Sequence, residues 1–340
     1  MLKDESSPAL ASLAELETTP LEQPTGFGSI DRLSPLGDIG FVGLGRMGAA
    51  MAANLAASGS RVIAYVRRRD QIDRLKPLSL EPTTDFTRLF KCKVVISMLT
   101  DDDAAREIVF GRKDIGLIGL GKGLMPGAIH LSMSTISTAT ASHLRSEHER
   151  HGQGFVAAPV FGNPAAAKAR QLFIAAAGVP ADVERCRPLL ENLGQRVFVI
   201  GTNPADANLF KLLGNMVTAT ALEMLGEVIA VIRKRGLDPK PFIDLMTSTN
   251  FGGRVHKIYG DKIVAQSYEP GFVMPLALKD VRLALTEAEN AGAPMPSVGV
   301  VRDRMITGIA RGHAGLDWTA LGLIAAEEAG IISAPSVPSN

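Results

Sequence analysis

Cysteine is nearly absent from this chain of 340 residues, which contains only Cys92 and Cys186. Two cysteines cannot build the disulfide framework of a small secreted domain, and their scarcity fits a reducing compartment. No apolar signal-peptide core occurs near the start, and the acidic residues there are atypical of a transit peptide. We therefore expect a cytoplasmic protein.

Aromatic residues make up only 5% of the chain, with no basic interleaving, so the stacking platform of a single-strand nucleic-acid binder is missing. The formal net charge of +1 gives no general attraction to nucleic acid or to an anionic membrane. The histidines show no convincing metal-ligand spacing, and His148 and His151 are predicted to lie on a solvated helix face. The sequence thus predicts no nucleic-acid partner, no membrane partner and no metal.

What the chain does contain is enough apolar sequence, 46% of its residues, for two domains. Residues 38–202 alternate strand-like and helix-like segments, which predicts an α/β fold with a doubly wound, mostly parallel sheet. Residues 203–330 read as helical, which predicts an all-α domain. Residues 1–37 and 331–340 are expected to be flexible tails. The expected strands are 38–42, 61–66, 93–98, 127–132, 154–157, 171–177 and 196–200.

The most informative motif is Gly43-Leu44-Gly45-Arg46-Met47-Gly48, which follows the first expected strand and opens an alanine-rich helix. In that context G-x-G-x-x-G predicts a dinucleotide site. Gly43 permits the tight turn, Gly45 lets the backbone approach a pyrophosphate, and Gly48 allows close packing of helix on strand. The helix N-terminus then stabilises the phosphate charge.

The second strand ends in Val66-Arg67-Arg68-Arg69, where an NAD-binding protein of this type would have an acidic residue for the ribose 2′-hydroxyl. Guanidinium groups can hold a 2′-phosphate by charge-assisted hydrogen bonds. A solvated basic turn would have the same composition. The sequence therefore favours NADP as the cofactor, with NAD as the alternative.

One long helix is predicted from Pro204 to about Arg235. Asn203 is a good N-cap, Pro204 suits the first helical position, and Gly236 ends the helix. Most of its circumference is apolar, which predicts a place in a core, and its charged side chains argue against a membrane span. We also expect this helical domain to pair subunits into a dimer or tetramer.

Four polar residues, Asn208, Lys211, Asn215 and Thr218, recur on this helix at spacings of three and four and so share one stripe. A buried ammonium without a partner is costly. Lys211 therefore either reaches solvent or a structural carboxylate, or serves as an acid–base group held by Asn215. In the second case desolvation and a cationic nicotinamide would both lower its pKa toward neutrality.

Together these motifs resemble the β-hydroxyacid dehydrogenase family, which includes 3-hydroxyisobutyrate dehydrogenases, tartronate semialdehyde reductases and glyoxylate/succinic semialdehyde reductases. The resemblance covers about residues 38–325. It implies a hydride transfer between a nicotinamide and the hydroxyl-bearing β-carbon of a small carboxylate substrate. The matching segments, in order, are the glycine-rich motif, Val95–Asp101, Met133-Ser134-Thr135, Ala158-Pro159-Val160-Phe161-Gly162-Asn163, Lys211 with Asn215, and Lys279-Asp280.

The resemblance also implies roles for the matched residues. Lys211 would be the acid–base group, and Asn215 would orient it or the substrate. Ser134 and the backbone amides at Gly162 and Asn163 would hold the substrate carboxylate. The cofactor would be bordered, beyond the glycine-rich motif and Arg67 and Arg68, by Val66, Met98, Leu99, Thr100, Thr135 and Lys279.

The chain departs from the family at the carboxylate pocket, where Phe161 stands for a serine and Asn163 for a glycine. A phenylalanine there suggests a less polar substrate than tartronate semialdehyde. Two other functions stay open. An imine reductase has a similar architecture but usually has aspartate or tyrosine where this chain has Lys211, and a non-catalytic cofactor-binding scaffold would have lost the lysine.

Overall fold

A computed structural model describes residues 37–249 and 252–331 of the chain. The tails predicted at 1–37 and 331–340 lie outside the described residues, apart from Gly37 and Ile331.

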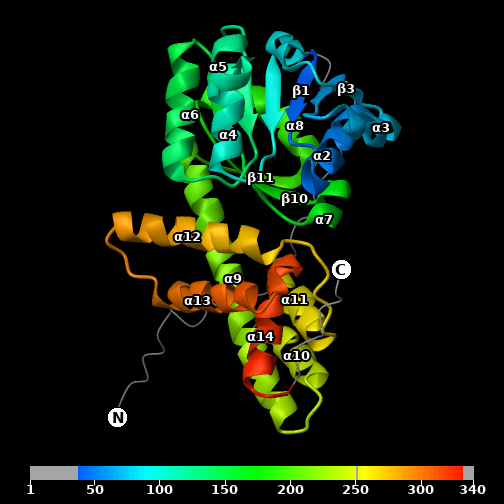
Figure 1. Cartoon of the computed structure of the whole chain (residues 1–340), viewed down its shortest axis with the longest axis vertical. Coiled ribbons are helices and arrows are strands. Elements are labelled where there is room, and N and C mark those ends of the chain that lie inside the picture. The colour runs from blue at the N-terminus through cyan, green and yellow to red at the C-terminus, as the bar shows by residue number, and fades with distance from the viewer. Residues whose placement is uncertain (1–36, 250–251, 332–340) are drawn as a thin grey trace, which may run out of the picture. The chain divides into compact units, whose positions relative to one another are not determined.

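The first part of the described chain forms a nine-stranded sheet of order β11-β10-β8-β7-β4-β1-β2-β3, with β9 paired to β10 (Figure 1). Paired strands are parallel except where β10 meets β8 and β9. The predicted doubly wound sheet and its seven strands are confirmed, whereas the short β3 and β9 were not predicted. The strands are β1 (Ile39–Val42), β2 (Val62–Tyr65), β3 (Glu81–Thr83), β4 (Val94–Ser97), β7 (Ile129–Ser132), β8 (Gly154–Ala157), β9 (Val160–Phe161), β10 (Leu172–Ala177) and β11 (Gly194–Gly201); β5 (Gly111–Arg112) and β6 (Leu117–Ile118) form a separate ribbon.

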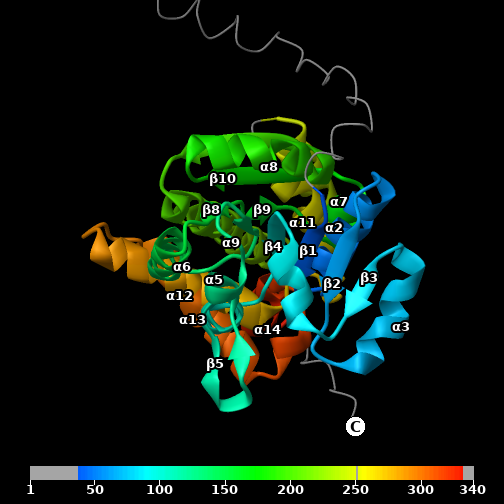
Figure 2. The ribbon, with the colours of Figure 1, turned by 90° about the horizontal axis from the view of Figure 1, so that it is seen from above.

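Helices cover both faces of the sheet, and Figure 2 shows α8 and α5 on opposite sides of the strands. One face packs Phe41 against Met51 and Leu55, and the other packs Val95 among residues of the opposite helices. Burial on both faces explains why the strands are continuously apolar. The helices are α2 (Arg46–Ala57), α3 (Ile72–Leu75), α7 (Pro164–Lys168) and α8 (Pro180–Leu193), with α4 (Asp102–Phe110), α5 (Leu120–Gly123) and α6 (Thr138–Arg150).

The order of the strands places a topological switch point between β1 and β4. The chain winds outward from this boundary in both directions, so the loops that follow β1 and β4 diverge there. Ligands of open α/β sheets bind at such a point, beyond the carboxyl ends of the strands. The glycine-rich motif and residues 98–101 are the two loops in question.

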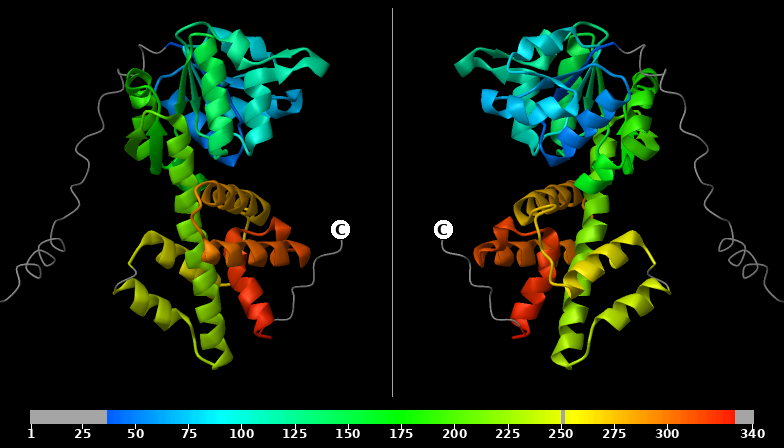
Figure 3. Two further views of the ribbon diagram at one scale, coloured as in Figure 1. Left: turned by 90° about the vertical axis from the view of Figure 1, so that its left-hand side faces the viewer. Right: turned by 90° about the vertical axis from the view of Figure 1, so that its right-hand side faces the viewer.

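The second part of the described chain is helical. Its longest element, α9 (Pro204–Lys234), has Asn203 as N-cap and ends just before Gly236, whose φ is +74°, so the predicted helix is confirmed. Figure 3 shows α9 running from the sheet into the helical part. The other helices are α10 (Lys240–Thr247), α11 (Arg254–Val264), α12 (Met274–Asn290), α13 (Pro296–Ala310) and α14 (Leu321–Glu328).

By length and composition α9 could cross a membrane. In the structure, however, it packs against α11, α12 and α14, as the core helix of a globular protein does. The prediction that its apolar circumference lies in a core is only partly right. Five large apolar side chains are exposed along the helix, and Val217 is 74% exposed. They are Phe210, Leu213, Val217, Met224 and Val231.

Candidate active site

The glycine-rich loop has the shape that a pyrophosphate requires. Gly43 has a φ of +90°, and a Cβ on it would lie 2.2 Å from the carbonyl oxygen of Met98. A Cβ on Gly48 would lie 2.0 Å from the carbonyl oxygen of Gly43. A Cβ on Gly45, by contrast, would meet nothing within 4 Å. The loop is therefore tight toward the protein and open at Gly45, so it fits the close approach of a dinucleotide phosphate.

The other residues of the motif hold this loop in place. Leu44 is buried, and its carbonyl oxygen accepts a hydrogen bond from Arg74 Nη2 at 3.1 Å. Met47 packs against the sheet core. Arg46 is exposed and donates to the carbonyl oxygen of Pro270, in the segment that precedes α12. No sequence motif points to Arg74, because its partner is a backbone atom thirty residues away.

Arg67 and Arg68 stand at the carboxyl end of β2, with side chains that are 60% and 71% exposed. Arg67 Nη2 lies 3.8 Å from Glu107 Oε1, and Arg68 Nε lies 3.3 Å from Asp70 Oδ1. Exposed pairs of this kind are weak, so both guanidinium groups are available to an anionic ligand. Val66 differs, since its side chain is buried in the core.

The loop after β4 is fastened to the loop after β7 through Ser134. Met98 and Leu99 are half-buried and Thr100 is exposed. Ser134 is fully buried, and its hydroxyl accepts from the Leu99 amide at 2.8 Å and donates to the carbonyl oxygen of Ser97 at 3.4 Å. The hydroxyl proton is therefore already used. In this structure Ser134 positions Leu99, and its role in holding the substrate carboxylate stays a prediction.

A chain of buried hydrogen bonds lies beneath the same loop. The amide nitrogen of Gln153 donates to the carbonyl oxygens of Gly121 and Leu124, which leaves its Oε1 as an acceptor for His148 Nδ1 at 2.6 Å. His148 Nε2 must then accept from His130 Nδ1 at 2.9 Å. In turn, His130 Nε2 accepts from the Ser97 hydroxyl at 2.8 Å.

This arrangement corrects the prediction that His148 lies on a solvated face, because the side chain is completely buried. Burial lowers the pKa of His148 to about 4, against the opposing effect of the hydrogen bond to Gln153. Burial, with a smaller contribution from His148, holds the pKa of His130 well below its ordinary value. Both rings are therefore neutral at physiological pH.

We expect the two histidines to make the protein sensitive to mild acid. Below pH 6.5 the unfolded chain binds a proton on His148 that the folded protein does not bind until about pH 4. The unfolding free energy should therefore fall across this window, by about 3 kcal/mol from this residue. Urea unfolding between pH 4.5 and 7 measures the effect. His148→Asn should make the pH dependence shallower, because only His130 then contributes, whereas His143→Asn, at an exposed position of the same helix, should leave it unchanged.

Lys211 lies at the centre of a buried polar network. Its Nζ donates to Asn215 Oδ1 at 2.8 Å, and Asn215 Nδ2 donates to Asp280 Oδ2 at 2.7 Å. Lys279 Nζ lies 3.0 Å from Asp280 Oδ1 and donates to the carbonyl oxygen of Thr135 at 2.6 Å. The stripe predicted on α9 is thus joined to α12 and to the loop after β7.

The environment of Lys211 suits proton transfer near neutral pH. Burial lowers the pKa of Lys211 to about 8; the Asp280 carboxylate opposes this shift and the Lys279 ammonium adds to it. Lys211 neither reaches solvent nor ends on a carboxylate of its own, and it is only 8% exposed. An ammonium whose pKa lies close to the working pH can both give and take a proton.

Asp280 belongs to the Lys279-Asp280 match, but the sequence predicted no role for it. It is 2% exposed and serves two cationic residues, Lys279 directly and Lys211 through Asn215. No local spacing could reveal this, because Asn215 and Asp280 are sixty-five residues apart and on different helices. In the sequence, the only indication of a role for Asp280 is that it directly follows Lys279.

The predicted substrate segment lies beside this network. The ring centroid of Phe161 is 4.3 Å from Lys211 Nζ. Gly162 and Asn163 follow and are exposed, and the side chain of Asn163 accepts from the Ala166 amide at 2.9 Å as the N-cap of α7. The cap thus occupies the side-chain oxygen of Asn163, and the role of the main-chain amides of these two residues in holding a carboxylate stays a prediction. The Thr218 hydroxyl already has a partner, since it donates to the carbonyl oxygen of Gly214 on its own helix.

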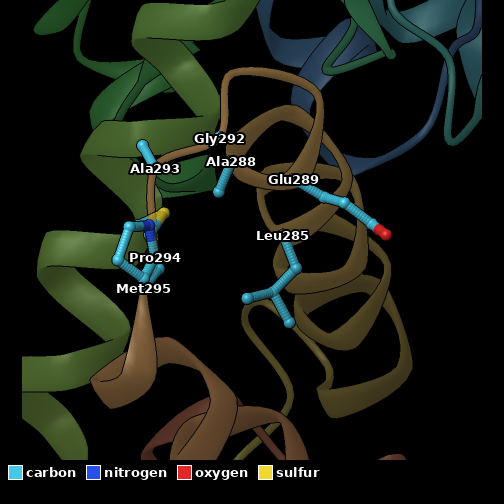
Figure 4. A pocket seen from close by; sticks show the side chains of 7 residues that line it. All are labelled: Leu285, Ala288, Glu289, Gly292, Ala293, Pro294 and Met295. Carbon is cyan, nitrogen blue, oxygen red and sulfur yellow. The ribbon is translucent and has the colours of Figure 1, made fainter.

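A hollow at the corner between α12 and α13 is separate from this network (Figure 4). Its one charged side chain, Glu289, extends away from the other side chains. None of the predicted site residues lines it, so it plays no part in the candidate site. The lining residues are Leu285, Ala288, Glu289, Gly292, Ala293, Pro294 and Met295.

Comparisons with known proteins identify the family of this chain. The family model for the NAD-binding domain of 6-phosphogluconate dehydrogenase matches residues 38–201. The model described as the NAD-binding of NADP-dependent 3-hydroxyisobutyrate dehydrogenase matches residues 205–323. An uncharacterized oxidoreductase of Bacillus subtilis, YfjR, is 36% identical over 83% of this chain and 98% of its own.

The chain belongs to the β-hydroxyacid dehydrogenase family. The resemblance drawn from the sequence is confirmed, and with it an NAD(P)-dependent oxidoreductase of this family. The 2-hydroxy-3-oxopropionate reductase of Escherichia coli is 28% identical over 83% of this chain and 95% of its own. A 3-hydroxyisobutyrate dehydrogenase of Mycobacterium tuberculosis superposes with a TM-score of 0.75 at 25% identity, covering 85% of this chain and 98% of its own.

Imine reductases share the fold at a greater distance. The enzyme from a Pseudomonas species superposes with a TM-score of 0.55 at 18% identity, over 85% of this chain and 99% of its own. Identity this low speaks for the architecture alone.

Proposed function

We propose that this chain is an NADP-dependent oxidoreductase that transfers a hydride between the nicotinamide and the β-carbon of a small hydroxyacid of the 3-hydroxyisobutyrate or semialdehyde type. The observation that supports it best is the buried Lys211, bonded to Asn215 and facing no structural carboxylate of its own. The relatives named for hydroxyacid and semialdehyde chemistry agree with this substrate class.

The glycine-rich loop would hold the pyrophosphate, and Arg67 and Arg68 the 2′-phosphate. When bound, the nicotinamide supplies or accepts the hydride. In the direction of reduction, the Lys211 ammonium donates a proton from Nζ to the substrate carbonyl oxygen, which becomes the hydroxyl. In the direction of oxidation, neutral Lys211 takes that hydroxyl proton back. Asn215 keeps Nζ directed, and Asp280 balances the charge of the protonated form.

An imine reductase is the alternative, and it would use the same cofactor on a cyclic imine. Lys211 argues against this alternative, because imine reductases usually have aspartate or tyrosine where this chain has a lysine. Assaying hydroxyacids, semialdehydes and cyclic imines with NADPH, and repeating each assay with Lys211→Ala, separates the two. Turnover of imines alone, unaffected by Lys211→Ala, would replace the proposal.

The preference for NADP gives a prediction at Arg67. Arg67→Ala should raise the KM for NADP by roughly tenfold to a hundredfold, because a charge-assisted bond contributes about 1.5–3 kcal/mol. The KM for NAD, which has no 2′-phosphate, should change little. Arg88→Ala provides the control, since that arginine pairs with Glu81. Equal effects of Arg67→Ala on both cofactors would contradict the assignment.

We further propose that the exposed side of α9 pairs two copies of this chain. Phe210, Leu213, Val217, Met224 and Val231 follow spacings of three, four and seven, which is the seam of a paired helix. An apolar hollow between α9 and α10, lined by Met224, Val228, Phe242 and Met246 among others, extends the same surface. A face repeated on both copies can bury itself in a two-fold dimer.

Light scattering tests this pairing. The unmodified protein should have the mass of a dimer or tetramer, and Val217→Glu should shift it to the monomer, because two buried carboxylates would meet across the axis. Ile118→Glu, at an apolar position exposed on β6, should leave the mass unchanged. A monomeric mass for the unmodified protein would refute the pairing.

A further inference from the structure

Phe161 and Gly214 are packed together against Lys211. The ring of Phe161 lies over the ammonium, and Gly214, on the turn of α9 after Lys211, provides the space for it. A Cβ on Gly214 would lie 2.5 Å from one ring carbon of Phe161 and 2.8 Å from the next. The ring can therefore occupy this place only because residue 214 has no side chain.

The backbone fixes the ring from the other side. Phe161 pairs with Phe173 across β9 and β10, and Gly162 follows with a φ of +147° and no room for a Cβ beside Leu172. The half-buried ring is thus held between the sheet and α9. It is not a surface side chain that happens to lie near a lysine.

This placement decides what a substrate meets. A carbonyl oxygen that receives a proton from Nζ comes within about 3 Å of it. The ring centroid is 4.3 Å from the same nitrogen, so the ring lines the space beside that carbonyl, where the neighbouring substituent would lie. The polar groups nearest on α9 offer no bond to it, because Asn215 is held by Lys211 and Asp280 and Thr218 by its own helix.

We propose that Phe161 and Gly214 together determine specificity, by selecting substrates with a hydrocarbon substituent beside the reacting carbonyl and disfavouring those with a hydroxyl there. The inference rests on the proposed function and adds to it the polarity of the substrate. A hydroxyl pressed against the ring would lose its hydrogen bonds with water and gain none. An apolar wall discriminates against such an isosteric hydroxyl by up to about a hundredfold.

The experiment compares two acids that differ only in this group. Methylmalonate semialdehyde carries a methyl where 2-hydroxy-3-oxopropionate carries a hydroxyl, and kcat/KM for each is measured with NADPH. We expect the unmodified protein to favour the methyl compound at least tenfold. Phe161→Ser should reduce this ratio toward one, whereas Phe161→Leu should keep it, because leucine remains apolar at similar size.

Gly214→Ala tests the pair. It should displace the ring and lower the ratio as Phe161→Ser does, yet have no further effect in the Phe161→Ser background. NADPH binding by fluorescence and circular dichroism show whether each variant is folded; if Gly214→Ala is not, the serine and leucine variants decide.

A ratio near one in the unmodified protein, or equal loss of it with leucine and serine, would overturn the inference. If neither the unmodified protein nor the Lys211→Ala variant reduces either acid, the proposed function is overturned instead. The two failures are therefore distinct.

Discussion

Replacing Lys211 with alanine is expected to lower kcat by about a hundredfold or more in both directions, while NADPH affinity changes little. A positioned acid–base group contributes about 10²–10⁴ to the rate, and no other described side chain within hydrogen-bonding distance of Asn215 Oδ1 can replace it. Steady-state kinetics with NADPH and a semialdehyde, beside fluorescence titration of NADPH, measure the two quantities.

Lys211→Arg separates proton transfer from charge. Arginine keeps a cation at this point but does not release a proton near neutral pH, so its activity should be as low as that of the alanine variant. In the unmodified protein, reduction needs the ammonium and should decline as pH rises through about 8, while oxidation should increase over the same range. Activity retained by the arginine variant would reduce Lys211 to an electrostatic role.

The second large effect is expected at Asp280. Asp280→Asn preserves an acceptor for Asn215 Nδ2 but removes the buried negative charge that raises the pKa of Lys211. The pH at which reductive activity declines should therefore move down by about one unit or more. At pH 8 the fraction of Lys211 that is protonated would then fall from about one half to about one tenth, so reductive kcat should fall by about fivefold or more.

The same substitution should also destabilise the protein, because two neighbouring ammonium groups lose their only described counter-charge within the network. Glu287→Gln is the matched control, since it removes a carboxylate from the same helix, where Glu287 accepts from Thr138. It should leave the pH profile in place. If the pH profile of reductive activity does not shift in Asp280→Asn, the role of Asp280 is only to hold Asn215.

The features that sequence could predict are local ones. The strands around Gly43 and the helix that carries Lys211 were correct because continuous apolar runs, capping residues and glycines act over a few positions. Lys211 and Asn215 were paired for the same reason, since one helical turn separates them.

What the sequence did not reveal depends on contacts between distant segments. The charged neighbours of His148 suggested solvent, but burial follows from His130 on β7 and Gln153 beyond α6. The bond between Ser134 and the Leu99 amide could not be predicted either, because the two residues lie on different loops. The exposed apolar side of α9 was hidden for a similar reason: composition does not tell which faces neighbouring helices cover.

The rotation between successive residues of a helix places two different surfaces of α9 next to each other in the sequence. Phe210 is 55% exposed, whereas Lys211, one residue later and rotated by about 100°, is buried and bonded to Asn215. A substitution at Phe210 can therefore alter the outer side of the helix while leaving the neighbouring amine in its buried network.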